Sequence, residues 1–222
     1  MIELLPHVEV ETANNPNAAI IWLHGLGADG HDFKPIVKQL DLPASAAIRF
    51  IFPHAPSLPI TINNGNVMPA WYDILEMNID RKVDQIQLKK SVNAIIGFID
   101  REIKRGISSD RIVITGFSQG GAVAFETALA FPQKLAGLLA LSTYFATKDT
   151  ISFHPTNMNL PIAIHHGEHD SIVPLSLANI SHQLLAEKNY PAILKTYPME
   201  HSVCRQQIED IRQWFLEVLN IT

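Results

Sequence analysis

Gly116-Phe117-Ser118-Gln119-Gly120, with Gly121 directly after it, is the stretch that decides the fold. The apolar run Arg111 to Thr115 precedes it, and a run rich in helix-forming residues, Ala122 to Phe131, follows it. A strand that turns into a helix within so few residues brings backbone close to backbone, and only glycine leaves enough room on either side of the serine. The sequence therefore predicts a sharp strand-to-helix turn with the Ser118 hydroxyl exposed at its apex.

A Gly-x-Ser-x-Gly pattern between a strand and a helix resembles the nucleophile elbow of the α/β-hydrolases. The alternative is a glycine-rich turn that carries a surface serine without a chemical role. A serine hydroxyl is a weak nucleophile unless a base takes its proton, and the base needs an acid to orient it. The first interpretation therefore requires a histidine and a carboxylate elsewhere in the chain.

Candidates for the acid and the base follow the serine in the chain order Ser, acid, His that is typical of this fold class. Asp170 lies in the loop after the apolar run Ile162 to His165, and His201 lies just after the run Ile193 to Tyr197. Both positions come beyond strand ends, where ligand sites of open α/β sheets form. The expected triad is Ser118, Asp170 and His201.

Other residues compete for these roles. Glu168 is a rival acid, because it lies only two residues from Asp170. His165, His166 and His169 suggest a metal site, but they lack the His-Glu-x-x-His spacing and do not fall on one helical face, so we expect no metal there. The chain has ten histidines, so a purely structural role for the one after the last strand is a further alternative.

Hydrolysis of an acyl compound also requires hydrogen-bond donors for the developing oxyanion. One donor is expected to be the backbone N–H of Gln119, directly after the serine. The loop His24-Gly25-Leu26-Gly27 follows the early apolar run Ala18 to Leu23, and its two glycines allow it to fold back toward the serine. We expect the N–H of Leu26 to be the second donor and His24 to hold the loop by hydrogen bonds. A turn without catalytic duty is the alternative.

Apolar runs of strand length alternate with helical patterns along the whole chain. The runs are apolar throughout, which is typical of strands covered on both faces in a parallel sheet. Strands that alternate with helices form βαβ units, so the sequence predicts one α/β domain over residues 1–222, with a mainly parallel sheet flanked by helices. The expected strands are Ala18–Leu23, Ile48–Phe52, Arg111–Thr115, Gly137–Ser142, Ile162–His165 and Ile193–Tyr197, and the expected helices lie within 83–103, 122–131, 177–185 and 203–219.

The stretch from Leu58 to Trp71 interrupts this alternation. It contains two short extended pieces joined by Asn63-Asn64-Gly65-Asn66, a strong turn signal, and its two prolines disfavour a central strand. We therefore expect a hairpin-like flap near residues 58–71 that covers an acyl group or touches a membrane; ordinary packing of a surface loop onto the core is the alternative. The candidate substrate-binding residues are Leu58, Ile60, Ile62, Val67, Met68 and Trp71.

Composition limits the class of protein. The 222 residues are 47% hydrophobic and 18% charged, which excludes intrinsic disorder. The net charge of −5, without a basic stripe, argues against nucleic acid as a partner and against electrostatic docking on anionic lipid. No apolar run approaches the roughly 18 residues of a membrane span, so we expect no stable membrane insertion. The single cysteine, Cys204, allows no intrachain disulfide and is expected to pack as a small buried side chain. The first eleven residues lack Lys and Arg, unlike the start of a secretory signal, so we expect a cytoplasmic protein.

Five motifs together give a resemblance that spans nearly the whole chain. In order they are Leu23-His24-Gly25-Leu26-Gly27, Ala70-Trp71-Tyr72-Asp73, Gly116-Phe117-Ser118-Gln119-Gly120-Gly121, His166-Gly167-Glu168-His169-Asp170 and Met199-Glu200-His201-Ser202. With these motifs the chain resembles the acyl-protein thioesterase/carboxylesterase family, also called the phospholipase/carboxylesterase group. The region Leu58 to Met68 departs from the family, because it is longer and more hairpin-like than the corresponding connection of the eukaryotic thioesterases.

The resemblance implies an α/β-hydrolase fold and a serine hydrolase that cleaves carboxylic esters and thioesters through an acyl-serine intermediate. It implies the triad and oxyanion donors named above and no metal or organic cofactor. Small acyl esters or thioesters are the implied substrates, including S-acylated proteins and lysophospholipids in some family members. A lysophospholipase-type lipid hydrolase and a non-catalytic binding protein of the same fold are the alternatives, and transient membrane contact through the flap is a further expectation.

Overall fold

A seven-stranded sheet forms the centre of the computed structural model, which describes residues 4–77 and 81–222. The strands lie in the order β1-β3-β2-β6-β7-β8-β9, and every neighbouring pair is parallel except β1 with β3. Their bounds are β1 (His7–Glu11), β2 (Ala18–Leu23), β3 (Ile48–Pro53), β6 (Ile112–Phe117), β7 (Gly137–Leu141), β8 (Ile162–Gly167) and β9 (Ala192–Tyr197). The mainly parallel sheet predicted from the sequence is confirmed.

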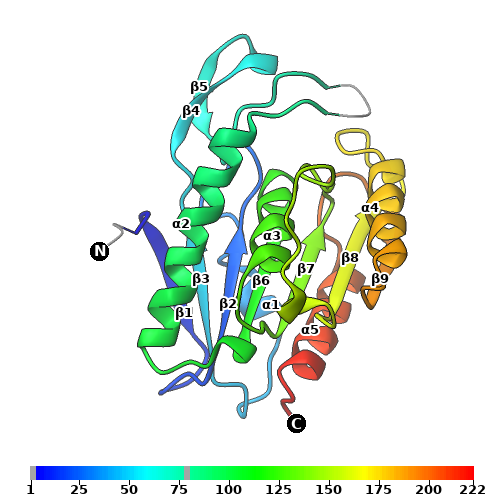
Figure 1. Ribbon diagram of the computed structural model, residues 1–222. Helices are drawn as coiled ribbons and strands as arrows, with labels where there is room; N and C mark the ends of the chain where they lie inside the picture. Colours follow the sequence, from blue (N-terminus) through cyan, green and yellow to red (C-terminus); the bar gives the residue numbers. More distant parts are fainter. Residues whose placement is uncertain (1–3, 78–80) are drawn as a thin grey trace.

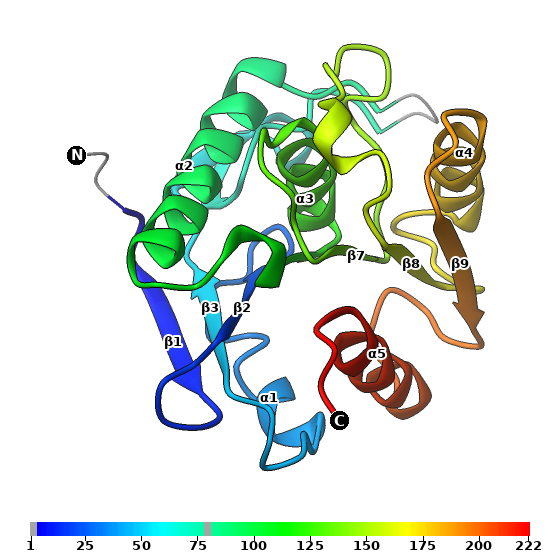
Figure 2. The same ribbon diagram turned by 60° about the horizontal axis from the view of Figure 1, so that its bottom comes forward.

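Helices cover both faces of this sheet. They are α1 (Ile36–Gln39), α2 (Gln85–Lys104), α3 (Gln119–Ala130), α4 (Leu175–Glu187) and α5 (Arg205–Val218), with short 3₁₀ turns at η1 (Thr61–Asn63), η2 (Ser109–Arg111) and η3 (Pro155–Asn157). Helices α2, α3 and α4 pack on one face, and α1 and α5 pack on the other (Figure 1 and Figure 2). The chain therefore forms three layers around one sheet.

Strand β2 shows why the apolar runs became central strands. All six of its side chains are buried. Alternate residues point to opposite faces of a strand, so Ala19, Ile21 and Leu23 join the apolar cluster under α2, α3 and α4, whereas the other three join the cluster under α1 and α5. Burying one large aliphatic side chain stabilises the fold by about 1.5–3 kcal/mol. A polar residue at either set of positions would lose that contribution.

One strand and one α-helix were not predicted from the sequence. Strand β1 pairs antiparallel with β3, and Arg49 of β3 contacts Glu11 at 2.8 Å and the fully buried Glu102 of α2 at 2.6 Å. Arg105, the residue directly after α2, also contacts Glu9 at 3.0 Å. These partners lie far apart in the sequence, so the charged, partly polar run of β1 becomes a strand through tertiary ion pairs. Helix α1 is the second addition, and its four residues are too few to give a periodic pattern.

The predicted helix starts also shift. Helix α2 begins at Gln85 rather than Val83, because the Asp84 carboxylate accepts hydrogen bonds from the N–H groups of Ile86 and Gln87 and caps the helix. Val83 instead forms an isolated β-bridge with Ile74. Helix α3 begins at Gln119, directly after the serine. The turn at the serine is therefore even sharper than predicted.

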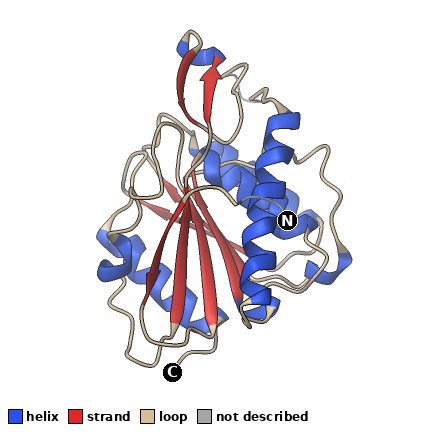
Figure 3. Cartoon of the chain, turned by 90° about the vertical axis from the view of Figure 1, so that its left-hand side faces the viewer, coloured by secondary structure: helices blue, strands red, loops and turns tan. Residues whose placement is uncertain are grey.

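The stretch between β3 and α2 leaves the sheet, as predicted. Strands β4 (Ser57–Ile60) and β5 (Asn66–Pro69) form a separate antiparallel pair. At its turn Asn64 and Gly65 have positive φ angles of 55° and 75°. The hairpin projects beyond the carboxyl ends of the parallel strands (Figure 1 and Figure 3). Within the described part of the chain, none of the helices combines the length and apolar character that a membrane span needs.

Candidate active site

The turn after β6 holds Ser118 in a strained conformation. Its φ and ψ are 53° and −120°, outside the regions that residues with a side chain prefer. A Cβ on Gly116 would lie 2.3 Å from the carbonyl oxygen of Gly120, and a Cβ on Gly120 would lie 2.5 Å from that of His24. These approaches exclude side chains at both glycine positions. The turn is held by hydrogen bonds from Ser118 N to Leu141 O (2.9 Å) and from the Thr143 hydroxyl to Ser118 O (2.6 Å).

Three side chains from separate strand ends meet at this turn. The His201 Nε2 atom lies 3.0 Å from the Ser118 hydroxyl oxygen, and His201 Nδ1 lies 2.7 Å from Asp170 Oδ2. With Nδ1 protonated and donating to the carboxylate, Nε2 accepts the hydrogen bond of the hydroxyl. The ring of Phe117 supports the imidazole, at 4.8 Å between ring centroids. The arrangement can transfer a proton from the serine to the histidine.

Asp170 is held as a carboxylate by its loop. Its Oδ1 accepts hydrogen bonds from the N–H groups of Ile172 (2.9 Å) and Val173 (2.7 Å). Burial by itself raises the pKa of this carboxyl, but the hydrogen bonds from His201 and Val173 outweigh it and bring the pKa below its ordinary value. The rival acid Glu168 is exposed, and its carboxylate accepts a hydrogen bond from the Thr196 hydroxyl at 2.9 Å. It is Asp170 that the structure brings to His201.

Two backbone N–H groups beside the serine have no hydrogen-bond partner among the described residues: those of Leu26 and Gln119. Gln119 stands at the N-terminus of α3, where the helix dipole favours negative charge. Leu26 lies in the loop after β2, whose Gly27 N–H donates to the carbonyl of Pro69 at 2.8 Å. Leu26 and Gln119, whose N–H groups are the predicted oxyanion donors, line the same cavity as Ser118.

A buried hydrogen-bond network holds that loop in place. The ring of His24 donates to Gly25 O (2.7 Å) and accepts from Ala55 N (3.1 Å), so both nitrogens are used. Burial lowers the pKa of His24, which keeps the ring neutral. Trp71 Nε1 donates to His24 O at 2.8 Å. His24 thus has the loop-holding role expected from the sequence.

The side chain of Gln119 performs a task that sequence reasoning missed. Its Oε1 accepts from the Trp71 N–H at 2.8 Å, and its Nε2 donates to the Tyr72 carbonyl at 2.6 Å. It therefore joins the start of α3 to the chain at the foot of the hairpin. The only sequence signal was that Gln119 and Ala70-Trp71-Tyr72-Asp73 both fall in motifs.

A cavity of about 360 Å³ opens at Ser118 and His201. Its walls are partly polar, near Gly25 and Asp32, and partly apolar. The apolar lining residues are Leu26, Ala28, Ile62, Ile74, Met77, Phe117, Tyr144 and Ile172. The volume and the apolar wall suit a small acyl group or the first part of a longer chain.

The six candidate substrate-binding residues of the flap do not share one location. Ile62 lines the cavity at Ser118. Leu58 and Trp71 line a separate depression of about 290 Å³, whose other lining residues include Gln87 and Lys90 of α2. Ile60 is fully buried, and Val67 is 68% exposed. Met68 is half-buried, with its sulfur 3.5 Å from the Asn63 amide.

The other histidines of the 165–170 region point in different directions. His165 Nδ1 contacts the Tyr197 hydroxyl at 3.2 Å, His166 Nε2 donates to the Val173 carbonyl at 2.7 Å, and His169 is exposed. Within 4–77 and 81–222 no three potential ligands gather in a metal-binding group. Cys204 is half-buried and precedes α5.

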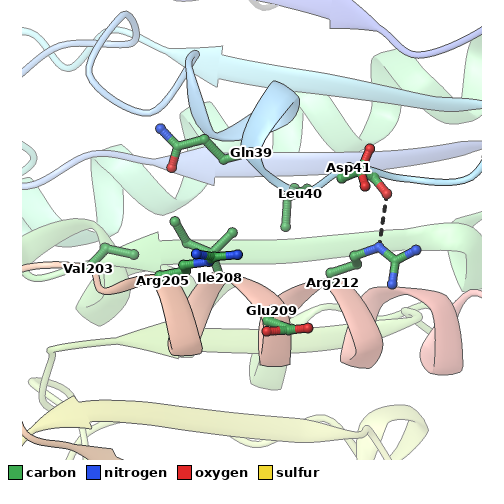
Figure 4. Close-up of a pocket in the computed structure, with 8 residues that line it drawn as sticks. All are labelled: Gln39, Leu40, Asp41, Val203, Arg205, Ile208, Glu209 and Arg212. Atoms are coloured by element: carbon green, nitrogen blue, oxygen red, sulfur yellow. Dashed lines mark hydrogen bonds between the residues drawn. The ribbon is translucent and has the colours of Figure 1, made fainter.

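A larger groove, of about 640 Å³, lies away from the cavity at Ser118 and His201. It runs between the end of α1 and helix α5 and is lined by Gln39, Leu40, Asp41, Val203, Arg205, Ile208, Glu209 and Arg212 (Figure 4). The Arg212 guanidinium donates to the Asp41 backbone carbonyl across it at 2.9 Å. This groove is larger than the cavity at Ser118, but Ser118, Asp170 and His201 are not among the residues that line it.

Known proteins resemble the chain over almost its full length. The model of the Phospholipase/Carboxylesterase family matches residues 5–220. Acyl-protein thioesterase 1 of Neurospora crassa is 36% identical over 96% of this chain and 92% of its own length. The crystal structure of Arabidopsis thaliana SOBER1 has a TM-score of 0.85 at 29% identity, covering 91% of this chain and 99% of that one. Zea mays acyl-protein thioesterase 2, at 23% identity, has the same fold, with a TM-score of 0.84 over 97% of this chain and 99% of its own.

Fold and site together define an α/β-hydrolase: a parallel sheet, a serine on a strained strand-to-helix turn, and a histidine and an aspartate after later strands. Within that class, the chain belongs to the phospholipase/carboxylesterase family.

Proposed function

We propose that the protein hydrolyses carboxylic esters and thioesters through an acyl intermediate on Ser118. The observation that carries this proposal is the continuous chain of hydrogen bonds from the Ser118 hydroxyl through His201 to Asp170, with distances of 3.0 and 2.7 Å. This chain of contacts opens into the cavity that also presents the free N–H groups of Leu26 and Gln119.

In the first half of the proposed reaction, His201 Nε2 takes the hydroxyl proton while the Ser118 oxygen attacks the acyl carbonyl carbon. The carbonyl oxygen becomes an anion and accepts hydrogen bonds from the two N–H groups; one such donor contributes roughly 2.7–4 kcal/mol to transition-state stability. Asp170 holds the imidazole in the required tautomer and stabilises its cation. The His201 proton then passes to the leaving alcohol or thiol as the bond to the acyl carbon breaks.

In the second half, water replaces the leaving group. His201 Nε2 takes a proton from the water, and the hydroxide oxygen bonds to the acyl carbon. Collapse of this second intermediate breaks the bond to the serine oxygen, which recovers its proton from His201, and the carboxylic acid leaves. Every step uses groups of this chain, the substrate and one water molecule, so the proposed cycle requires no metal or organic cofactor.

The apolar wall of the cavity supports an acyl substrate, and the names of the relatives support a thioester among the natural substrates. S-acylated proteins and lysophospholipids are the two proposed classes of larger substrate. We further propose that residues 1–222 act as one domain, because the site draws on residues from Leu26 to His201. A cytoplasmic location is proposed from the single cysteine, which excludes an intrachain disulfide.

Replacing the nucleophile tests the proposal. Ser118→Ala should lower kcat on p-nitrophenyl acetate and on an S-acylated peptide by roughly 10⁶-fold, because the triad acts as a unit. The variant should unfold in urea at the same midpoint as the wild type and should no longer react with a fluorophosphonate probe. Ser57→Ala, an exposed serine on the hairpin, serves as the matched control and should retain full activity. A wild type that neither turns over the substrates nor reacts with the probe would refute the proposed function.

A further inference from the structure

Arg81 is a buried cation beside the catalytic cavity. Arg81 is only 7% exposed, and in the sequence it lies between Ile74 and Val83, which pair in an isolated antiparallel β-bridge. Its Nη2 donates to the backbone carbonyl of Ile172, and its Nη1 lies 3.4 Å from the sulfur of Met77. The guanidinium carbon lies 5.0 Å from the centre of the Tyr144 ring. The Arg81 side chain therefore contacts three other residues: the backbone of Ile172 and the side chains of Met77 and Tyr144.

All three contacted residues line the cavity at Ser118. They come from three separate segments: Met77 from the stretch between the hairpin and α2, Tyr144 from the loop after β7, and Ile172 from the loop that follows Asp170. The loop before α4 lies at the end of the sheet where the hairpin also projects (Figure 1). The hydrogen bond from Arg81 to Ile172 ties the stretch before α2 to this loop. Arg81 is thus the point at which three parts of one cavity wall are joined.

The wall needs such a connection because the core does not hold it. Met77 and Ile172 are 49% and 52% exposed, so they lack the close packing that fixes buried apolar side chains. Tyr144 is fixed from its other side, since its hydroxyl shares a hydrogen bond of 2.9 Å with that of Tyr72. Tyr144 can therefore serve as the anchor against which Arg81 holds the two exposed residues.

Arginine suits this position better than lysine. Its planar guanidinium donates in its own plane while its face stacks on an aromatic ring, so it satisfies the Ile172 carbonyl and the Tyr144 ring at once. A lysine ammonium is a point charge that reaches one of these partners at a time.

We propose that Arg81 is a positioning residue that sets the apolar wall of the cavity and thereby the length of acyl chain that the enzyme accepts. This inference rests on the proposed ester hydrolysis. Long acyl chains must contact the wall of Met77, Tyr144 and Ile172, whereas an acetyl group reaches little beyond Ser118 and the oxyanion donors. Loss of Arg81 therefore affects long chains selectively.

Steady-state kinetics on p-nitrophenyl acetate and octanoate test the proposal. Arg81→Met should raise KM for octanoate by roughly tenfold, since a hydrophobic wall discriminates by about 1–3 kcal/mol, and should leave KM and kcat for acetate within about twofold. Arg81→Lys should give an intermediate octanoate-to-acetate ratio of kcat/KM. Lys82→Met removes the neighbouring, exposed cation and should keep the wild-type ratio.

An unchanged octanoate-to-acetate ratio in Arg81→Met, or an equal loss on both esters, would overturn the role of Arg81. If Arg81→Met does not fold, Arg81→Lys becomes the deciding variant, and an unchanged octanoate-to-acetate ratio in Arg81→Lys would overturn the role of Arg81. Fluorophosphonate labelling of each variant separates this outcome from failure of the proposed function: a labelled, active wild type with unaltered selectivity in the variants contradicts only the inference about Arg81.

Discussion

The turn at Ser118 and the hairpin of β4 and β5 stand at the same end of the sheet, but they are held in opposite ways. At the turn, a Cβ added to Gly120 would lie 2.5 Å from the His24 carbonyl oxygen, so neighbouring backbones fix its position. At the tip of the hairpin, a Cβ added to Gly65 would have no neighbour within 4 Å, and Val67 is 68% exposed. The turn at Ser118 is fixed by the core, whereas the tip of the hairpin is fixed by little more than its own backbone turn.

The turn and the hairpin differ in how precisely each must be positioned. A nucleophile must be placed within about half an ångström of its productive position, which only a rigid, closely packed turn provides. An element that contacts the variable part of a substrate has no such requirement, and segments outside the sheet tolerate change in sequence and length. We therefore expect substitutions at the turn to destroy activity, and substitutions of those residues of the hairpin region that line the cavity to change selectivity.

Gly120→Ala should have the largest effect on the comparison. The added Cβ would overlap the backbone of the loop after β2, so the variant should lose roughly 3 kcal/mol of unfolding free energy. The start of α3 and the Leu26 loop would also separate, and kcat/KM for p-nitrophenyl acetate should fall by at least about 100-fold. Urea denaturation and steady-state kinetics measure the two effects.

Gly65→Ala is the matched substitution in the hairpin. Its φ of 75° makes alanine strained there by about 1 kcal/mol, but the added methyl meets no neighbour. Activity on acetate should not change. Equal losses of stability and activity in the two variants would contradict the distinction between a turn fixed by the core and a hairpin that stands outside it.

Acid should weaken the sheet before it weakens the hairpin. His165 is buried within β8, and burial lowers its pKa to about 4; the Asp210 charge raises the pKa and the Lys195 charge lowers it, both by less than burial does. Between pH 6.5 and about 4 the His165 ring is therefore protonated in the unfolded chain but neutral in the folded chain. The free energy of unfolding consequently falls as pH falls. At the lower end of this range the loss from His165 is roughly 3 kcal/mol.

Urea unfolding of His165→Gln from pH 7 to pH 4 measures this contribution. The variant should lose stability less steeply over that range, although His24 and His166, whose pKa values are also lowered by burial, keep part of the slope. His169→Gln removes an exposed histidine and serves as the control. An identical slope in the wild type and in His165→Gln would show that burial of His165 in β8 does not cause the loss of stability in acid.

The sequence reveals the parts of this site that obey local rules. The glycines around Ser118 follow from the geometry of a tight turn, and the chain order of the fold class leads to Asp170 and His201. Apolar runs predict the parallel strands because both of their faces are covered. Strand β1 cannot be predicted in this way, because Glu9 and Glu11 are accommodated in a strand only through ion pairs with Arg105 and Arg49.

The residues that local rules miss act through contacts across the fold. Nothing near Gln119 in the sequence indicates that its amide binds the backbone of Trp71 and Tyr72, and nothing near Arg81 indicates that it contacts Tyr144 and Ile172. The direction of each flap residue is also a tertiary property. The pattern predicts a hairpin, but only its attachment to the sheet decides which side chains turn toward Ser118.

The smallest expected effect separates two apolar residues of the hairpin region. Ile62 lies on the cavity wall, whereas Val67 points into solvent near the tip. Ile62→Ala should raise KM for p-nitrophenyl octanoate about threefold to tenfold and should leave acetate hydrolysis unchanged, because the lost methyl groups would contact only a longer chain. Val67→Ala should change neither substrate in free solution. If Val67→Ala impaired octanoate hydrolysis as much as Ile62→Ala, the tip itself would have to fold over the bound chain, and the hairpin would belong to the substrate site along its whole length.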